Sequence, residues 1–157
     1  AGIAVDANRI PDAIRLFDEA ADASRDPLLR DAAALKAAWL AMDSETLAQI
    51  EARLTPLAKD GRPFSPFALE ALAMARLQNG QVAPAREALV LLKNGLDTPA
   101  VIGQRADLAI AAIDAGAGAD LKKIVDAQRN LPVAPVRPAA AQPGPAPAAA
   151  PAAPARP

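Results

Sequence analysis

Between positions 1 and 130, apolar and polar side chains alternate with the period of an α-helix. Apolar side chains recur three and four residues apart, which places them on one face of a helix. Seven stretches follow this pattern, and we expect helices at about 11–23, 27–42, 44–58, 66–79, 82–94, 99–115 and 119–130. Runs of valine, isoleucine, threonine and tyrosine, which favour strands, are absent. The pattern therefore predicts an all-α fold.

Prolines and glycines mark the expected ends of these helices. Proline at the first turn is favourable because its missing N–H has no partner within the helix. Ser65-Pro66 and Thr98-Pro99 are therefore predicted to be N-cap and first-turn pairs. Glycines at positions 80, 95 and 116 follow periodic segments and are expected in the left-handed conformation. Loops of mostly two to five residues predict antiparallel neighbours, with "AKDGRPFS" as a longer connection.

The helical segments also repeat. At one constant offset, Ala13 pairs with Ala85, Phe17 with Leu89, Ala20 with Leu92 and Pro27 with Pro99. Helix starts recur at positions 27, 66 and 99, and the first interval is the longer because it contains "AKDGRPFS". A small residue followed four positions later by a large one is typical of the second helix of a tetratricopeptide repeat, whose period is about 34 residues. We therefore expect an antiparallel α-hairpin stack, a tetratricopeptide-like superhelix.

This alignment makes the segment from Ala13 the second helix of a repeat. Its first helix is then expected to lie almost entirely before residue 1. The chain starts "AGIAVDANRI", without methionine or a signal-peptide pattern. We expect the natural protein to extend upstream by at least one helix.

The amino-acid composition limits the reactions and ligands that the chain could support. The chain has neither cysteine nor histidine, so the usual general base, thiolate nucleophiles and the commonest transition-metal ligands are missing. We therefore predict no catalytic residues, no cofactor and no metal site, and a protein that is not an enzyme. A net charge of -1 gives no basic face for nucleic acid. With 52% apolar but only 3% aromatic residues, alanine and leucine are expected to build the core.

The C-terminal segment has a different composition. Residues 131–157, "LPVAPVRPAAAQPGPAPAAAPAAPARP", contain nine prolines and eleven alanines. Proline at this density opposes helix and favours extended polyproline II. We expect two parts: a tetratricopeptide-like domain at 1–130, truncated at its N-terminus, and a disordered Pro/Ala-rich tail at 131–157. The tail is interpreted as a spacer, with a docking ligand for a proline-recognising groove as the alternative.

Four residues are candidates for a partner-binding surface. The first helix of each repeat usually lines the groove of such arrays. By repeat position the groove would include Phe67, Glu70, Met74 and Leu77. Ordinary packing is the alternative interpretation for these side chains.

The remaining candidates have plainer interpretations. Trp39, the only tryptophan, shares a helical stripe with Leu35 and Met42 and is expected to pack against the next repeat. A partner hot spot is the alternative for Trp39. The nearest approach to paired carboxylates is interpreted as solvated surface charge: Asp18-Glu19 and Glu45/Glu51.

A narrower resemblance is carried by four segments. They are "DPLLRD" at 26–31, Arg53-Leu54 with Leu57, "GRPF" at 61–64, and Gly80. Over about residues 8–116 the chain resembles the periplasmic domain of the ancillary Sec translocon subunit family of proteobacteria. That family carries a tetratricopeptide-like domain after one N-terminal membrane helix.

The resemblance implies a function and a location. The expected role is a non-enzymatic protein-interaction module, a chaperone-adaptor subunit at the Sec translocon. Its partners would be translocon subunits and periplasmic chaperones. It would act at the periplasmic side of the bacterial inner membrane, held by an upstream anchor helix. The alternative is a structural accessory subunit of another membrane complex.

Overall fold

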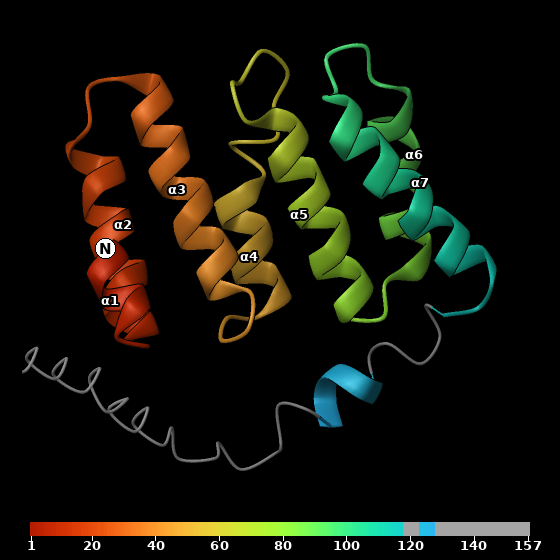
Figure 1. Cartoon of the computed structure of the whole chain (residues 1–157), viewed down its shortest axis with the longest axis horizontal. Coiled ribbons are helices and arrows are strands. Elements are labelled where there is room, and N and C mark those ends of the chain that lie inside the picture. Colours follow the sequence, from red (N-terminus) through yellow and green to blue (C-terminus); the bar gives the residue numbers. More distant parts are fainter. Residues whose placement is uncertain (118–122, 128–157) are drawn as a thin grey trace, which may run out of the picture.

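A computed structural model describes residues 1–117 and 123–127 of the chain (Figure 1). Within these ranges the secondary structure is entirely helical. The helices are α1 (Gly2–Asp6), α2 (Ile10–Ala23), α3 (Pro27–Ala41), α4 (Leu47–Leu54), α5 (Ser65–Gln78), α6 (Val82–Asn94) and α7 (Ala100–Asp114), followed by a short helix at 123–127.

The helices stand side by side in a row and run up and down in sequential antiparallel pairs (Figure 1). Each of α1 to α6 packs against the next helix in the chain, and α7 also contacts α5. The predicted all-α architecture of antiparallel pairs is confirmed. The predicted tail at 131–157 and most of the predicted helix at 119–130 lie outside the described residues.

The sequence analysis did not identify the first helix of the structure. The structure has a short helix, α1, directly before α2, where the repeat pattern predicted almost none. Ala4 of α1 is 2% exposed, and Asn8 takes a positive φ of 54° in the turn that follows. So short a segment contains too few positions for an apolar period to be recognised, so α1 left no pattern.

Four helix ends also differ from the prediction. The helix expected at 44–58 is only Leu47–Leu54, because Thr46 forms a capping box with Gln49. Pro56 has no N–H to donate to the carbonyl four residues before it, and the regular helix ends just ahead of this proline. Ser65 and Thr98 are not N-caps, since α5 and α7 are preceded by Phe64 and Pro99 in that position.

The glycine predictions are confirmed at two positions of three. Gly80 and Gly116 have φ values of 79° and 90°, as expected for left-handed helix ends. Gly95 instead follows α6 in an extended conformation, with φ at -69°. A Cβ at Gly95 would lie 2.6 Å from the Thr98 hydroxyl, so the close approach of the α6–α7 loop explains this glycine.

The core consists of two clusters that meet at α5. The first joins α3, α4 and α5 around Leu35, Ile50, Leu54, Leu57 and Leu72. The second joins α5, α6 and α7 around Ala73, Leu89, Leu92, Ile102 and Ala106. Because Leu72 and Ala73 are adjacent, α5 buries neighbouring residues on two different sides. Small alanines at the crossings allow close approach, as the composition predicted.

Burial agrees with the sequence repeat at its small positions and less well elsewhere. Ala13 and Ala85 are both completely buried, and so is Leu89. Phe17, the counterpart of Leu89, is only partly buried, and Ala20 is exposed where Leu92 is buried. The helices α2 and α6 are therefore most alike at their small, completely buried alanines, Ala13 and Ala85.

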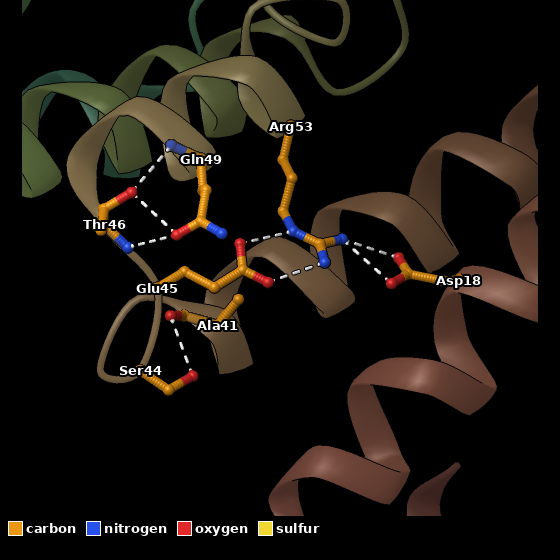
Figure 2. A network of polar contacts seen from close by, with 7 residues as sticks. All are labelled: Asp18, Ala41, Ser44, Glu45, Thr46, Gln49 and Arg53. Carbon is orange, nitrogen blue, oxygen red and sulfur yellow. Dashed lines mark hydrogen bonds and ion pairs between the residues drawn. The ribbon is translucent and has the colours of Figure 1, made fainter.

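An arginine links the first helices through a network that the sequence did not reveal (Figure 2). Both Nε and Nη2 of Arg53 donate to Glu45 at 2.8 Å, and Nη1 donates to the two oxygens of Asp18 at 2.8 and 3.0 Å. The hydrogen bonds to Glu45, and then those to Asp18, raise the pKa of Arg53. The guanidinium therefore stays charged and joins α2 to α4.

The interpretation of the four carboxylates as simple solvated charge was thus wrong for three of them. Asp18 and Glu45 hold Arg53, and Glu51 accepts from Nε of Arg76 in α5 at 2.9 Å. Only Glu19 is exposed and paired within its own helix, with Arg15. The partners in these pairs are far apart in the sequence and meet only after the helices have packed.

Replacing Arg53 with alanine should lower the free energy of unfolding by about 1–2 kcal/mol, because charge-assisted hydrogen bonds are lost and two partly buried carboxylates face each other. Urea denaturation measures the loss. Arg53→Lys should recover part of it through one remaining ion pair. Arg86→Ala is the matched control, since the Arg86–Asp114 pair is exposed and should matter less. Equal losses for Arg53→Ala and Arg86→Ala would contradict the linking role of Arg53.

Candidate partner-binding surface

Three of the four aromatic side chains of the chain lie together at the surface. The protein has one tryptophan, three phenylalanines and no tyrosine. Trp39 of α3, Phe64 at the end of the α4–α5 loop and Phe67 of α5 line an open hollow of about 150 Å³, together with Ala32, Leu35 and Lys36. We call this the aromatic hollow. An apolar space of about this volume accommodates a benzene-sized group.

The aromatic hollow is partly rigid and partly open to solvent. Phe64 and Phe67 pack edge to face, with ring centroids 6.1 Å apart and an interplanar angle of 65°. Both also pack against the first core cluster, which fixes their positions. Trp39 remains 44% exposed, although the sequence predicted that it would pack against the next repeat. Trp39 does meet Phe64 and Phe67 of the next helix pair, but nearly half of its side chain stays open to solvent.

A second and larger depression begins on the other side of Phe67. This loop groove, of about 790 Å³, lies between the α4–α5 loop and the α6–α7 loop, with the first turn of α5 and the end of α6 as its walls. Phe67 lines both the aromatic hollow and the loop groove. Leu91 is 72% exposed and Leu96 is fully exposed at the edge of the loop groove. Asp60 and Asp97 are exposed charged residues of its lining.

A buried ion pair holds the α4–α5 loop in place. Nη2 of Arg62 in this loop donates to Oδ1 of Asp31 in α3 at 2.6 Å, and the Asp31 side chain is only 1% exposed. The hydroxyl of Ser65 donates to the carbonyl of Ala58 at 2.9 Å, closing the loop from its other end. Gly61, with φ at 76°, makes the turn. These contacts fix one wall of the loop groove.

The four residues predicted to form a partner surface have different environments in the structure. Phe67 is partly exposed and lines both depressions, as expected for such a surface. Glu70 accepts from Nε of Arg105 in α7 at 2.6 Å. Met74 packs against the second core cluster, and Leu77 is buried at 8% exposure. Because Leu77 is buried, it is removed from the candidate surface.

Sequence reasoning missed the residues that surround Phe67. Phe64, Leu91 and Leu96 were not recognised, and Trp39 was assigned to packing. One signal was available: in a chain with 3% aromatic residues, two phenylalanines stand three positions apart in "PFSPF" beside the longest loop. The contribution of α6 had no comparable signal, because Leu91 and the buried Leu92 are adjacent leucines.

Among the residues that the structure describes, no group of three or more acidic residues is placed to hold a metal ion. In the same part of the chain, none of the helices has the length and apolar character needed to cross a membrane.

Fold and surface together define the class of protein: a stack of antiparallel helix pairs with an aromatic hollow and an open apolar groove beside its loops. No family model, no curated protein and no solved structure matches the chain. The class therefore rests on the geometry of the chain itself.

Proposed function

We propose that this chain is a non-enzymatic protein–protein interaction module that binds its partner at the aromatic hollow and the loop groove. One observation carries the proposal: Trp39, Leu91 and Leu96 are exposed around a depression of about 790 Å³ and its neighbouring hollow. Clustered exposed apolar side chains mark interaction sites, and tryptophan is enriched among residues that dominate binding energy. The absence of histidine and cysteine from the sequence supports a binding function over a catalytic one.

The finer architecture that we propose is a tetratricopeptide-like superhelix. The recurrence of helix starts at positions 27, 66 and 99 and the complete burial of Ala13 and Ala85 support it. In this arrangement α3, α5 and α7 are the first helices of successive repeats. The aromatic hollow then lies between two first helices, where such arrays usually bind their partners.

The partner that the sequence resemblance implies is the bacterial Sec translocon with its periplasmic chaperones. Most residues that carry the resemblance build the fold: Asp31 and Arg62 form the buried pair, Arg53 links helices, and Leu54 is completely buried. The resemblance therefore supports the architecture more directly than the partner. We propose the translocon adaptor, on the periplasmic side of the inner membrane and held by an upstream anchor, with a structural accessory subunit of another membrane complex as the second candidate.

Affinity purification from detergent-solubilised bacterial membranes tests both candidates. A tagged wild-type protein should recover translocon subunits and periplasmic folding factors in quantitative mass spectrometry. The double variant Trp39→Ala/Leu91→Ala should lose about tenfold or more of this recovery, since a tryptophan hot spot contributes at least about 2 kcal/mol. Leu108→Ala is the matched control, because Leu108 of α7 is also 72% exposed but lies outside the hollow and groove.

The possible outcomes separate the candidates. Salt-resistant, stoichiometric recovery of one other membrane complex would replace the translocon adaptor with the structural subunit. Equal recovery by the wild type and the Trp39→Ala/Leu91→Ala variant would overturn the assignment of the binding surface.

A further inference from the structure

The Pro/Ala-rich segment begins with prolines at every third position. In residues 131–138, "LPVAPVRP", these are Pro132, Pro135 and Pro138. Polyproline II has three residues per turn, so this spacing places all three rings on one edge. Proline-rich segments in this conformation bind to surfaces lined by aromatic side chains. We propose that residues 131–138 occupy the aromatic hollow and the loop groove of their own chain when no partner is bound. This proposal rests on the proposed function of that surface.

The aromatic hollow has the composition and size that a proline ring requires. Trp39, Phe64 and Phe67 form its walls, and its volume of about 150 Å³ suits one ring at a time. An amphipathic helix would need a continuous groove for anchors spread over two turns, whereas an extended segment can place one proline in the hollow and the next beyond Phe67. Phe67 lines both depressions, so one edge of prolines can follow it from the hollow into the loop groove.

The charges of the two parts are complementary. Residues 131–157 contain Arg137 and Arg156 and no acidic residue. In a helix with three residues per turn, Arg137 shares an edge with Leu131 and Ala134, next to the edge of prolines. The loop groove has exposed Asp60 and Asp97 in its lining, and its one basic lining residue, Arg62, is paired with Asp31. Lys36, the basic residue of the aromatic hollow, lines only that hollow. With a proline of this segment against Phe67, the arginine edge can face these carboxylates.

The chain between α7 and the proline-rich segment is long enough for that segment to reach the aromatic hollow. Figure 1 shows that α7 ends at the opposite end of the stack from the α4–α5 loop. One helix length and two interhelical spacings separate the end of α7 from the aromatic hollow, about 30 Å. Fourteen steps lead from Ala117 to Leu131, and residues 123–127 are helical. Five helical residues and nine further residues can span at most about 35 Å, which is sufficient.

A segment tethered beside its own binding surface competes with partner proteins for that surface. Because this linker must span most of its full reach, its effective concentration is at most about 1 mM, so a segment with a dissociation constant of about 100 µM would occupy the site up to about nine-tenths of the time. A partner that uses the same surface must displace it. The segment then acts as a competitive regulator and keeps the exposed tryptophan covered between binding events.

Trp39 provides the test because it is the only tryptophan of the chain. The full-length wild type is compared with the variant P132A/P135A/P138A and with the matched control P147A/P151A/P154A. Acrylamide quenching of Trp39 fluorescence should increase in the first variant and remain unchanged in the control. A synthetic LPVAPVRP peptide, titrated in trans, should bind P132A/P135A/P138A more tightly than wild type, by up to about tenfold, since no tethered competitor is present.

Three results would overturn the proposal. The first is equal quenching and equal peptide affinity in the wild type and P132A/P135A/P138A. The second is a peptide that binds neither protein. The third is a dependence of wild-type quenching on protein concentration, which would assign the covering segment to a second copy of the chain.

The proposed function is judged separately, by partner recovery with Trp39→Ala/Leu91→Ala. Lost recovery in that variant, together with no peptide binding, would retain the binding surface and reject only the self-occupying segment.

Discussion

Replacing Arg62 with methionine lowers the free energy of unfolding by about 3 kcal/mol, because it leaves the Asp31 carboxylate buried without its partner. Asp31 is 1% exposed, and its nearest other cation, Nε of Arg30, is 3.9 Å away. Methionine preserves much of the apolar stem of the arginine, so the loss reports mainly on the charge. Chemical denaturation of the full chain, followed by circular dichroism, measures it.

The double variant Asp31→Ala/Arg62→Met is the control for this expectation. It leaves neither charge buried and should recover most of the stability, as buried ion pairs often contribute little once both members are replaced. Wild-type stability of Arg62→Met alone would show that Asp31 does not depend on Arg62. A loss in the double variant as large as in Arg62→Met would show that packing, and not charge, is responsible.

The second large effect is expected at Leu89. Leu89→Ala should cost about 3 kcal/mol of stability, because the side chain is completely buried between α5, α6 and α7 and its removal leaves a cavity. Thermal and urea unfolding should both report the loss. The expected result follows from burial and does not depend on the proposed function.

Leu91, two positions further along α6, supplies a matched control. It is 72% exposed, so Leu91→Ala should change stability by no more than about 0.5 kcal/mol. Leu91 nevertheless lines the loop groove, so the same variant should weaken partner recovery, whereas folded Leu89→Ala should retain it. A large stability loss in Leu91→Ala, or intact partner recovery, would contradict the description of this groove.

Helices were the most predictable feature of the chain, since their signals are local. The prolines at 27 and 66 and the apolar period located α3 and α5 to within one residue at most boundaries. The exceptions are instructive. Segment 2–6 is too short to show a period. Helix α4 begins late at its capping box and ends early at Pro56, and both signals act on single residues.

The candidate site was only partly predictable. Phe67 was selected from its repeat position and does line the surface. Leu77, chosen by the same reasoning, is buried, because a period identifies a helical face but cannot say which of two neighbours will cover it. On α5 two faces are buried at once, so its pattern contained no unambiguous exposed side.

The sequence by itself determined that this protein is built from helices, that they pair in antiparallel order, and that alanine and leucine form the core. Each of these follows from local spacing, short loops and composition. Only the tertiary structure decided that Arg53 joins Asp18 to Glu45, that Asp31 is buried against Arg62, and that Trp39 meets Phe64 and Phe67. These contacts join residues that are distant in the sequence, on different helices or on a helix and a loop, and their existence depends on how the helices pack against one another.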